Sequence, residues 1–183
     1  MTRPNVLGVD PSLTSTGISA ESGLATIRSS PSDHQPPTLE DRRRRLVRIV
    51  RDVVAYAPVF TDLVVIESPS LGQARQGGTL DRNGLFWLLV DEFAGLKIPV
   101  VDVTPATVKK FATGNGGAKK PDLRMALYKR TDLDIADDNQ VDAWWLAEIG
   151  RHLLTAPSIS LPYTHVKALE KVTLPHPDLE VST

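Results

Sequence analysis

The chain has 183 residues, a length that suits one domain with a hydrophobic core of its own. Apolar residues make up 41% of it and charged residues 23%, and no apolar run is long enough to span a membrane. There is no cysteine, which excludes disulfides, thiolate metal sites and cysteine nucleophiles. The net charge of -1 favours no class of partner by itself. Without a secretory signal pattern at the N-terminus, the expected location is the cytoplasm, away from membranes.

The first third of the chain predicts three strands, a helix and a fourth strand. Two of the strands are buried apolar runs that end in a carboxylate, Asp10 and Glu67, each followed by turn-forming residues. Thr38 and Asp41 form an approximate capping box, after which apolar residues recur at helical spacing as far as Ala57. The predicted strands cover residues 5–13, 16–22, 24–30 and 63–67.

The rest of the chain predicts helices around one more strand. Residues 68–84 are rich in Gly and Pro and predict a mobile loop, and the helix that follows runs through Leu96. Its core, LFWLLV (Leu85–Val90), is apolar on every side and should be buried on two sides. Residues 98–103 predict the fifth strand, and further helices are expected to begin near Thr104–Pro105 and about Pro121 and to cover Asp138–Leu154.

This order of elements predicts an α/β domain in which helices flank a mixed five-stranded sheet. We expect residues 1–154 to form that domain. Residues 155–183 contain several prolines and show no clear period, so they are predicted to be an extended or disordered tail.

Charge is segregated along the chain. Residues 105–130 contain seven basic residues and one acid, whereas residues 131–150 contain six acids and no Lys or Arg. A second basic block, RRRR, spans Arg42–Arg45. This alternation suits a protein that binds a polyanion with one surface and cations with another, although any single block is also typical of a solvated face.

Carboxylates are predicted to meet at one edge of the sheet. If their strands are parallel neighbours, Asp10 and Glu67 come within reach of one ion, because ligands collect at the carboxyl ends of such strands. Asp142 lies near the start of the last helix, and either Asp138 or Asn139 lies one turn earlier on the same face. Oxygen ligands without Cys or His favour Mg²⁺ or Mn²⁺, and two such ions could clamp both oxygens of a phosphodiester.

Four segments, in this order and spacing, resemble the RuvC-type Holliday junction resolvases, and phage members in particular. They are GVDPSLTSTG, VVIESPS, TPATVKKFATGNGGAKK and DNQVDAWWLAE, of which the third is the most distinctive. The resemblance covers about residues 5–154 and implies a ribonuclease H-like fold. It further implies a homodimeric endodeoxyribonuclease that cuts branched DNA, especially four-way junctions, by paired symmetric nicks with two Mg²⁺ or Mn²⁺ ions. The compartment would be the host cytoplasm if the protein is phage-encoded.

The resemblance also implies roles for individual residues. By motif, three carboxylates bind the metal ions and two lysines lie near the scissile phosphate: Asp10, Glu67, Asp142, Lys109 and Lys120.

Two positions depart from the family pattern. Asn139 stands where the family often has an aspartate, and Asp138 precedes it, so either residue could complete the metal site; we favour Asp138, acting through water. Ser70 stands where bacterial members have an aromatic residue, which leaves junction selectivity less defined than the cleavage chemistry.

Alternative interpretations remain open for the function and for several residues. The protein could be a flap or branched-DNA endonuclease with little junction preference, or a non-catalytic nucleic-acid-binding relative, although the retained carboxylates argue against the latter. Asp137 is interpreted as a helix N-cap that forms a capping box with Gln140. Trp144 and Trp145 are interpreted as core residues. The apolar LFWLLV segment predicts a dimer, because a second surface must cover it.

Overall fold

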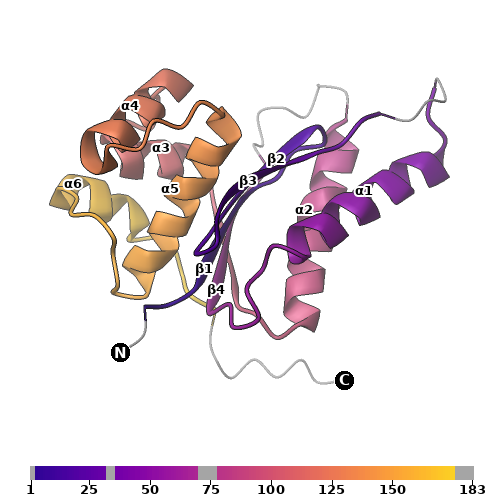
Figure 1. Cartoon of the computed structure of the whole chain (residues 1–183), viewed down its shortest axis with the longest axis horizontal. Helices are drawn as coiled ribbons and strands as arrows, with labels where there is room; N and C mark the ends of the chain where they lie inside the picture. Colours follow the sequence, from indigo (N-terminus) through magenta and orange to yellow (C-terminus); the bar gives the residue numbers. More distant parts are fainter. Residues whose placement is uncertain (1–2, 32–35, 70–77, 176–183) are drawn as a thin grey trace.

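A mixed five-stranded sheet separates two layers of helices (Figure 1). The structure is a computed structural model, and it describes residues 3–31, 36–69 and 78–175. The strand order is β3-β2-β1-β4-β5, in which β1, β4 and β5 are parallel and β2 and β3 are antiparallel to their neighbours. The strands are β1 (Val6–Asp10), β2 (Ser15–Ala20), β3 (Gly23–Arg28), β4 (Leu63–Glu67) and β5 (Val100–Val103).

Helices cover both faces of this sheet. One face packs against α1 and α2, and the other packs against α5, with α3 and α4 outside it (Figure 1). This arrangement confirms the predicted α/β class with its mixed five-stranded sheet. The main helices are α1 (Leu39–Val54), α2 (Thr79–Gly95), α3 (Pro105–Thr113), α4 (Lys120–Thr131) and α5 (Asp138–Leu153).

The first helix and its capping box are as predicted. The Thr38 hydroxyl accepts a hydrogen bond from the Asp41 N–H, and the Asp41 carboxylate accepts one from the Thr38 N–H at 3.0 Å. The buried residues of α1 (Ile49, Val50 and Val53) recur at helical spacing and face the sheet. The capping signal was readable because both partners lie within four residues of each other.

The second helix begins earlier than predicted. α2 starts at Thr79 rather than near Leu85, so the last residues of the predicted loop belong to its first turns. Its N-cap is Gly78, which has a positive φ of 82° and contributes no side-chain capping bond. A helix that starts without a Ser, Thr, Asp or Asn cap lacks the usual sequence signal. Residues 70–77, including Ser70, lie outside the described residues.

Two glycines let α5 approach the sheet closely. A Cβ atom on Gly8 of β1 would clash with the Ala143 carbonyl oxygen and come within 2.5 Å of the Ala147 nitrogen. A Cβ on Gly17 of β2 would clash in the same way with the backbone of Asn139. The helix backbone therefore lies directly on the strands. This contact fixes the first turns of α5 beside the carboxyl end of β1.

The variant Gly8→Ala should therefore destabilise the fold strongly. We expect a loss of about 2–3 kcal/mol in the free energy of unfolding, because backbone atoms rather than flexible side chains would have to move. The control is Gly95→Ala at the end of α2, where an added Cβ meets no atom within 4 Å. Urea denaturation of the two variants checks the expectation, and equal stabilities would contradict the close packing of α5 on β1.

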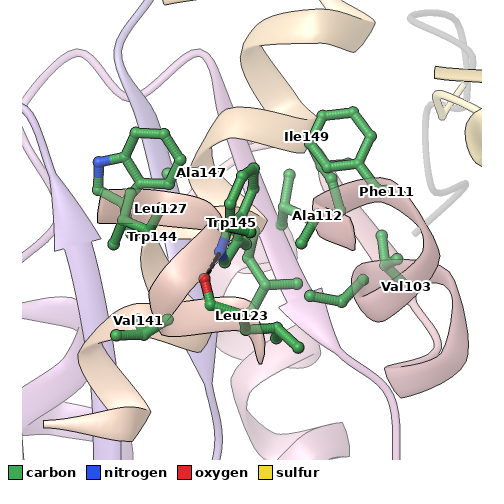
Figure 2. Close-up of a cluster of buried hydrophobic side chains, with 14 of the residues drawn as sticks. Val103, Phe111, Ala112, Leu123, Leu127, Val141, Trp144, Trp145, Ala147 and Ile149 are labelled. Carbon is green, nitrogen blue, oxygen red and sulfur yellow. Dashed lines mark hydrogen bonds between the residues drawn. The ribbon is translucent and has the colours of Figure 1, made fainter. Parts of the chain in front are cut away.

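The core between the sheet and α3–α5 is built around Trp145 (Figure 2). Trp145 is fully buried, and its indole Nε1–H donates to the Leu123 carbonyl of α4 at 3.2 Å. Its ring meets Phe111 of α3 and Trp144 in edge-to-face contacts. The interpretation of both tryptophans as core residues is confirmed. The Trp145 side chain of α5 thus packs against both α3 and α4, so it joins the basic helices to the acidic one.

The described part of the C-terminal region differs from the predicted extended or disordered tail. It contains the short helices α6 (Tyr163–Val166) and η2 (Lys167–Leu169), which pack against α3. The fully buried Glu148 carboxylate of α5 accepts hydrogen bonds from the backbone N–H groups of Ser158 and Ile159 at 2.8 and 3.1 Å. A buried carboxylate is stable only with such donors. These hydrogen bonds therefore hold residues 158–159 against α5. Residues 176–183 lie outside the described residues.

No helix in the described ranges is both long enough and apolar enough to cross a membrane.

Candidate active site

Three carboxylates that are far apart in sequence line one cleft of about 380 Å³. Asp10 ends β1 and Glu67 ends β4, and the two strands are adjacent and parallel. Asp142 reaches the same cleft from the second turn of α5, which the glycine contacts hold against β1 and β2. The predicted convergence of these three residues at the carboxyl edge of the sheet is therefore what the structure shows.

Two lysines line the cleft beside the carboxylates. Lys109 comes from α3 and Lys120 is the first residue of α4. The Lys120 ammonium lies 3.6 Å from Asp142 Oδ2. Thr104 caps α3 by accepting a hydrogen bond from the Thr107 N–H, with Pro105 in the first turn. The glycine-containing turn then reverses the chain, so both lysines of the third motif face one cleft.

The cleft raises the pKa values of all three carboxyl groups. Burial is the main cause of the rise at Asp10, whose pKa lies well above its usual value, and the charges of Glu67 and Asp142 add to it. Burial and the Asp142 charge raise the pKa of Glu67 to about 7. Burial also raises the pKa of Asp142, although Lys120 partly offsets that rise. Burial, more than repulsion between the carboxylates, disfavours the charged forms of all three groups.

The residues at the start of α5 have distinct environments. Asp137 is the N-cap as predicted, since its Oδ1 accepts from the Asn139 N–H at 2.9 Å. Burial raises its pKa, but hydrogen bonds from Thr26 and Asn139 outweigh that effect, and the net pKa is lowered. Gln140 does not complete the predicted capping box: its Nε2 donates to the Thr26 hydroxyl at 3.0 Å.

Asp138 and Asn139, the two candidates for a fourth ligand, lie outside the described lining of the cleft. The Asn139 amide donates to the Ser15 hydroxyl at 3.0 Å and to Asp137 at 3.1 Å, so it fastens the helix start to β2. Asp138 raises the pKa of Asp142 through its charge. Of the two, Asp138 is thus the one electrostatically coupled to the carboxylate cluster.

Polar residues in the first turns of α2 were missed as cleft residues from the sequence. Arg82 and Asn83 of α2 line the cleft, and Phe86 forms part of its apolar wall. Arg82 and Asn83 belong to a segment predicted as loop. A side chain can be assigned to a helix face only once the start of the helix is known. The available signal was the polar pair placed one helical turn before the apolar run Leu85–Val90.

The donor set of the cleft suits a hard divalent cation. Carboxylate oxygens are the ligands that Mg²⁺ and Mn²⁺ prefer, and a bound cation would favour the charged forms that burial and neighbouring carboxylates disfavour here. Within the described ranges, no three acidic or histidine side chains lie close enough together to form a complete metal-binding group. The ligand chemistry fits such an ion. For all three carboxylates to bind the same ion, their side chains would have to move closer together.

Comparison with known proteins finds similarity to RuvC proteins. The crossover junction endodeoxyribonuclease RuvC of Rhodopirellula baltica is 26% identical over 159 residues, which cover 83% of this chain and 88% of that protein. The Thermus thermophilus RuvC structure matches with a TM-score of 0.58 and 19% identity, covering 85% of this chain and 99% of that one. T. thermophilus RuvC in complex with Holliday junction substrate matches with a TM-score of 0.60 and 19% identity, covering 86% and 99%. No family model matches.

The structural likenesses show a ribonuclease H-like fold, as predicted. Together with the sequence match, they confirm the predicted resemblance of this chain to the RuvC-type resolvases.

Proposed function

We propose that this protein is a metal-dependent, structure-selective DNA endonuclease that resolves four-way junctions by paired symmetric nicks. The single observation that carries this proposal is the cleft in which Asp10, Glu67 and Asp142 meet Lys109 and Lys120 on a RuvC-like fold. Buried carboxylates beside two lysines, one of them ion-paired with Asp142, suit a site that takes up cations and a phosphate.

The carboxylates would hold two Mg²⁺ or Mn²⁺ ions, with Asp10, Glu67 and Asp142 as direct ligands. Bound there, such ions activate water and stabilise the attacking and leaving oxygens of a phosphodiester. Lys109 and Lys120 would orient the scissile phosphate and balance the charge that develops on it. Asp138 would support the site through its charge on Asp142, whereas Asn139, which hydrogen-bonds Ser15 and Asp137, would position the helix.

A homodimer would match the two-fold symmetry of a four-way junction. The support comes from α2, where the LFWLLV segment is buried on one side only: Leu85 and Leu89 are fully buried, whereas 65% of Trp87 and 38% of Leu88 are exposed. Leu80, which is 73% exposed, lies two turns before them on the same stripe. An apolar stripe of this kind is suited to a second copy of the chain.

The decisive experiment is a substrate panel. Labelled four-way junction, flap, replication fork and linear duplex are incubated with the protein in Mg²⁺, Mn²⁺ or EDTA. The proposal predicts symmetric nicks in the junction that EDTA abolishes. Equal cutting of all branched substrates would favour the flap or branched-DNA alternative, and cutting that persists in EDTA would defeat the proposed mechanism.

The variant Lys120→Met should slow the cleavage step. We expect a loss of about 100-fold in the single-turnover rate, because a cation beside the reacting phosphate is removed from a partly buried cleft. The control is Lys119→Met, a neighbouring exposed lysine that does not line the described cleft. Quench-flow assays with junction DNA measure both rates, and equal losses in the two variants would contradict the role of Lys120.

A further inference from the structure

A basic groove of about 330 Å³ lies on the opposite side of α3 from the active-site cleft. Lys109 of α3 lines the cleft, whereas the next residue, Lys110, lines the groove. Successive helical residues differ in direction by about 100°, so one short helix presents a cation to each side. The opposite wall of the groove comes from the C-terminal segment, here residues 163–171 with α6 and η2, which contributes Lys167 and Lys171.

The charge of the groove is uncompensated. Its described lining contains three lysines and one acid, Glu170. All three lysines are exposed, and within the described ranges none of them forms an ion pair. Gly116, in the turn after α3, forms part of the floor and adds no side-chain obstruction. An exposed concave surface with this charge suits an extended polyanion.

The C-terminal segment holds its lysines on a fixed support. His165 of α6 is buried, and its ring Nδ1 hydrogen-bonds the Phe111 carbonyl of α3 at 2.9 Å. Leu169 of η2 is buried in the same core as Trp145. Leu169 thus lies between Lys167 and Lys171 in the sequence and anchors both to the core.

We propose that this groove binds phosphates of the duplex arm that leads away from the scissile phosphate, so that the C-terminal segment is part of the DNA-binding surface. The inference rests on the proposed function, because it takes the cleft as the place of the scissile phosphate. The cleft and the groove are separated by one helix, about 10–12 Å in diameter. Each strand of a duplex carries one phosphate per about 3.4 Å of helix axis, so the groove would receive phosphates a few nucleotides from the cut.

The test compares two triple variants that each remove three positive charges. One is Lys110→Gln with Lys167→Gln and Lys171→Gln; the control is Arg43→Gln with Arg44→Gln and Arg51→Gln, on the far face of the sheet. Fluorescence anisotropy with a four-way junction in EDTA gives Kd at several salt concentrations. We expect the groove variant to bind about tenfold or more weakly and to lose about 2–3 from the slope of log K against log salt. A slope equal to that of the wild type, or an equal loss in the control, would overturn the inference.

A variant of opposite sign completes the test. Glu170→Gln should tighten binding, because it removes the one acid from the lining, whereas weaker binding would count against a phosphate site.

The readouts also separate this inference from the proposed function. If the wild type cuts no branched DNA while the groove variants shift Kd as expected, the proposed function fails and the groove stands only as a DNA-binding surface. If the wild type cuts junctions and the groove variants bind unchanged, the groove alone fails.

Discussion

The variants Asp10→Asn and Glu67→Gln should each lower the rate of junction cleavage by on the order of 10³-fold or more. Both side chains end neighbouring parallel strands and line the same cleft, and neither amide can supply the charge of the carboxylate it replaces. DNA affinity measured in EDTA should stay equal or increase, because removing a negative charge lessens the repulsion of phosphate. A loss of cleavage without a loss of affinity would identify these residues as catalytic.

The control for this pair is Asp102→Asn, an exposed carboxylate of β5 in the same sheet. Single-turnover cleavage and calorimetric titration with Mn²⁺ should be unchanged there, whereas Asp10→Asn should lose measurable Mn²⁺ binding. Asp138→Asn should lie between them if Asp138 acts through its charge on Asp142. Cleavage by Asp10→Asn at a rate near that of the wild type would refute the assignment of the cleft as the active site.

The positions of the site carboxylates could be predicted because they follow from short-range rules. A buried apolar run that ends in a carboxylate marks a strand end, and parallel neighbours bring such ends together. The pairing of Val6 with Leu63 and of Val9 with Ile66 is the register that places Asp10 beside Glu67. The helix cap at Asp137 was readable in the same way, because its hydrogen bond is made within two residues.

The features that were missed depend on tertiary contacts. The chain around His165 and Leu169 has no helical period of its own, and it folds because α3 offers a carbonyl and an apolar surface. Gln140 turned to Thr26, which lies 114 residues away and is brought close only by the packing of α5 on the sheet. Arg82 of the cleft lining was missed because α2 begins at Gly78 without a side-chain cap, so its start could not be predicted. The contacts of His165, Leu169 and Gln140 have no local sequence signal, and the one for Arg82 can be used only once the helix start is known.

The stability of the protein should fall as the pH rises from about 4.5 to 7, and Glu67→Gln should remove part of that fall. A carboxyl group with a raised pKa binds its proton more tightly in the folded state than in the unfolded chain. Its stabilising effect is complete below the unfolded value of 4.5 and is lost as the pH passes the folded value of about 7. The raised pKa values of Asp10 and Asp142 act in the same direction.

At pH 8 the Glu67→Gln variant should therefore be more stable than the wild type by up to about 3 kcal/mol, since each unit of pKa shift corresponds to about 1.4 kcal/mol. The two proteins should approach equal stability near pH 4.5. Urea denaturation in EDTA across this range measures the difference, with Glu92→Gln, at an exposed position of α2, as the control. Adding Mg²⁺ at pH 8 should stabilise the wild type more than the variant, because the ion binds only the folded site. If the unfolding free energies of the two proteins changed in parallel with pH, the pKa of Glu67 would not be raised in the folded state. The electrostatic argument for cation binding in the cleft would then fail.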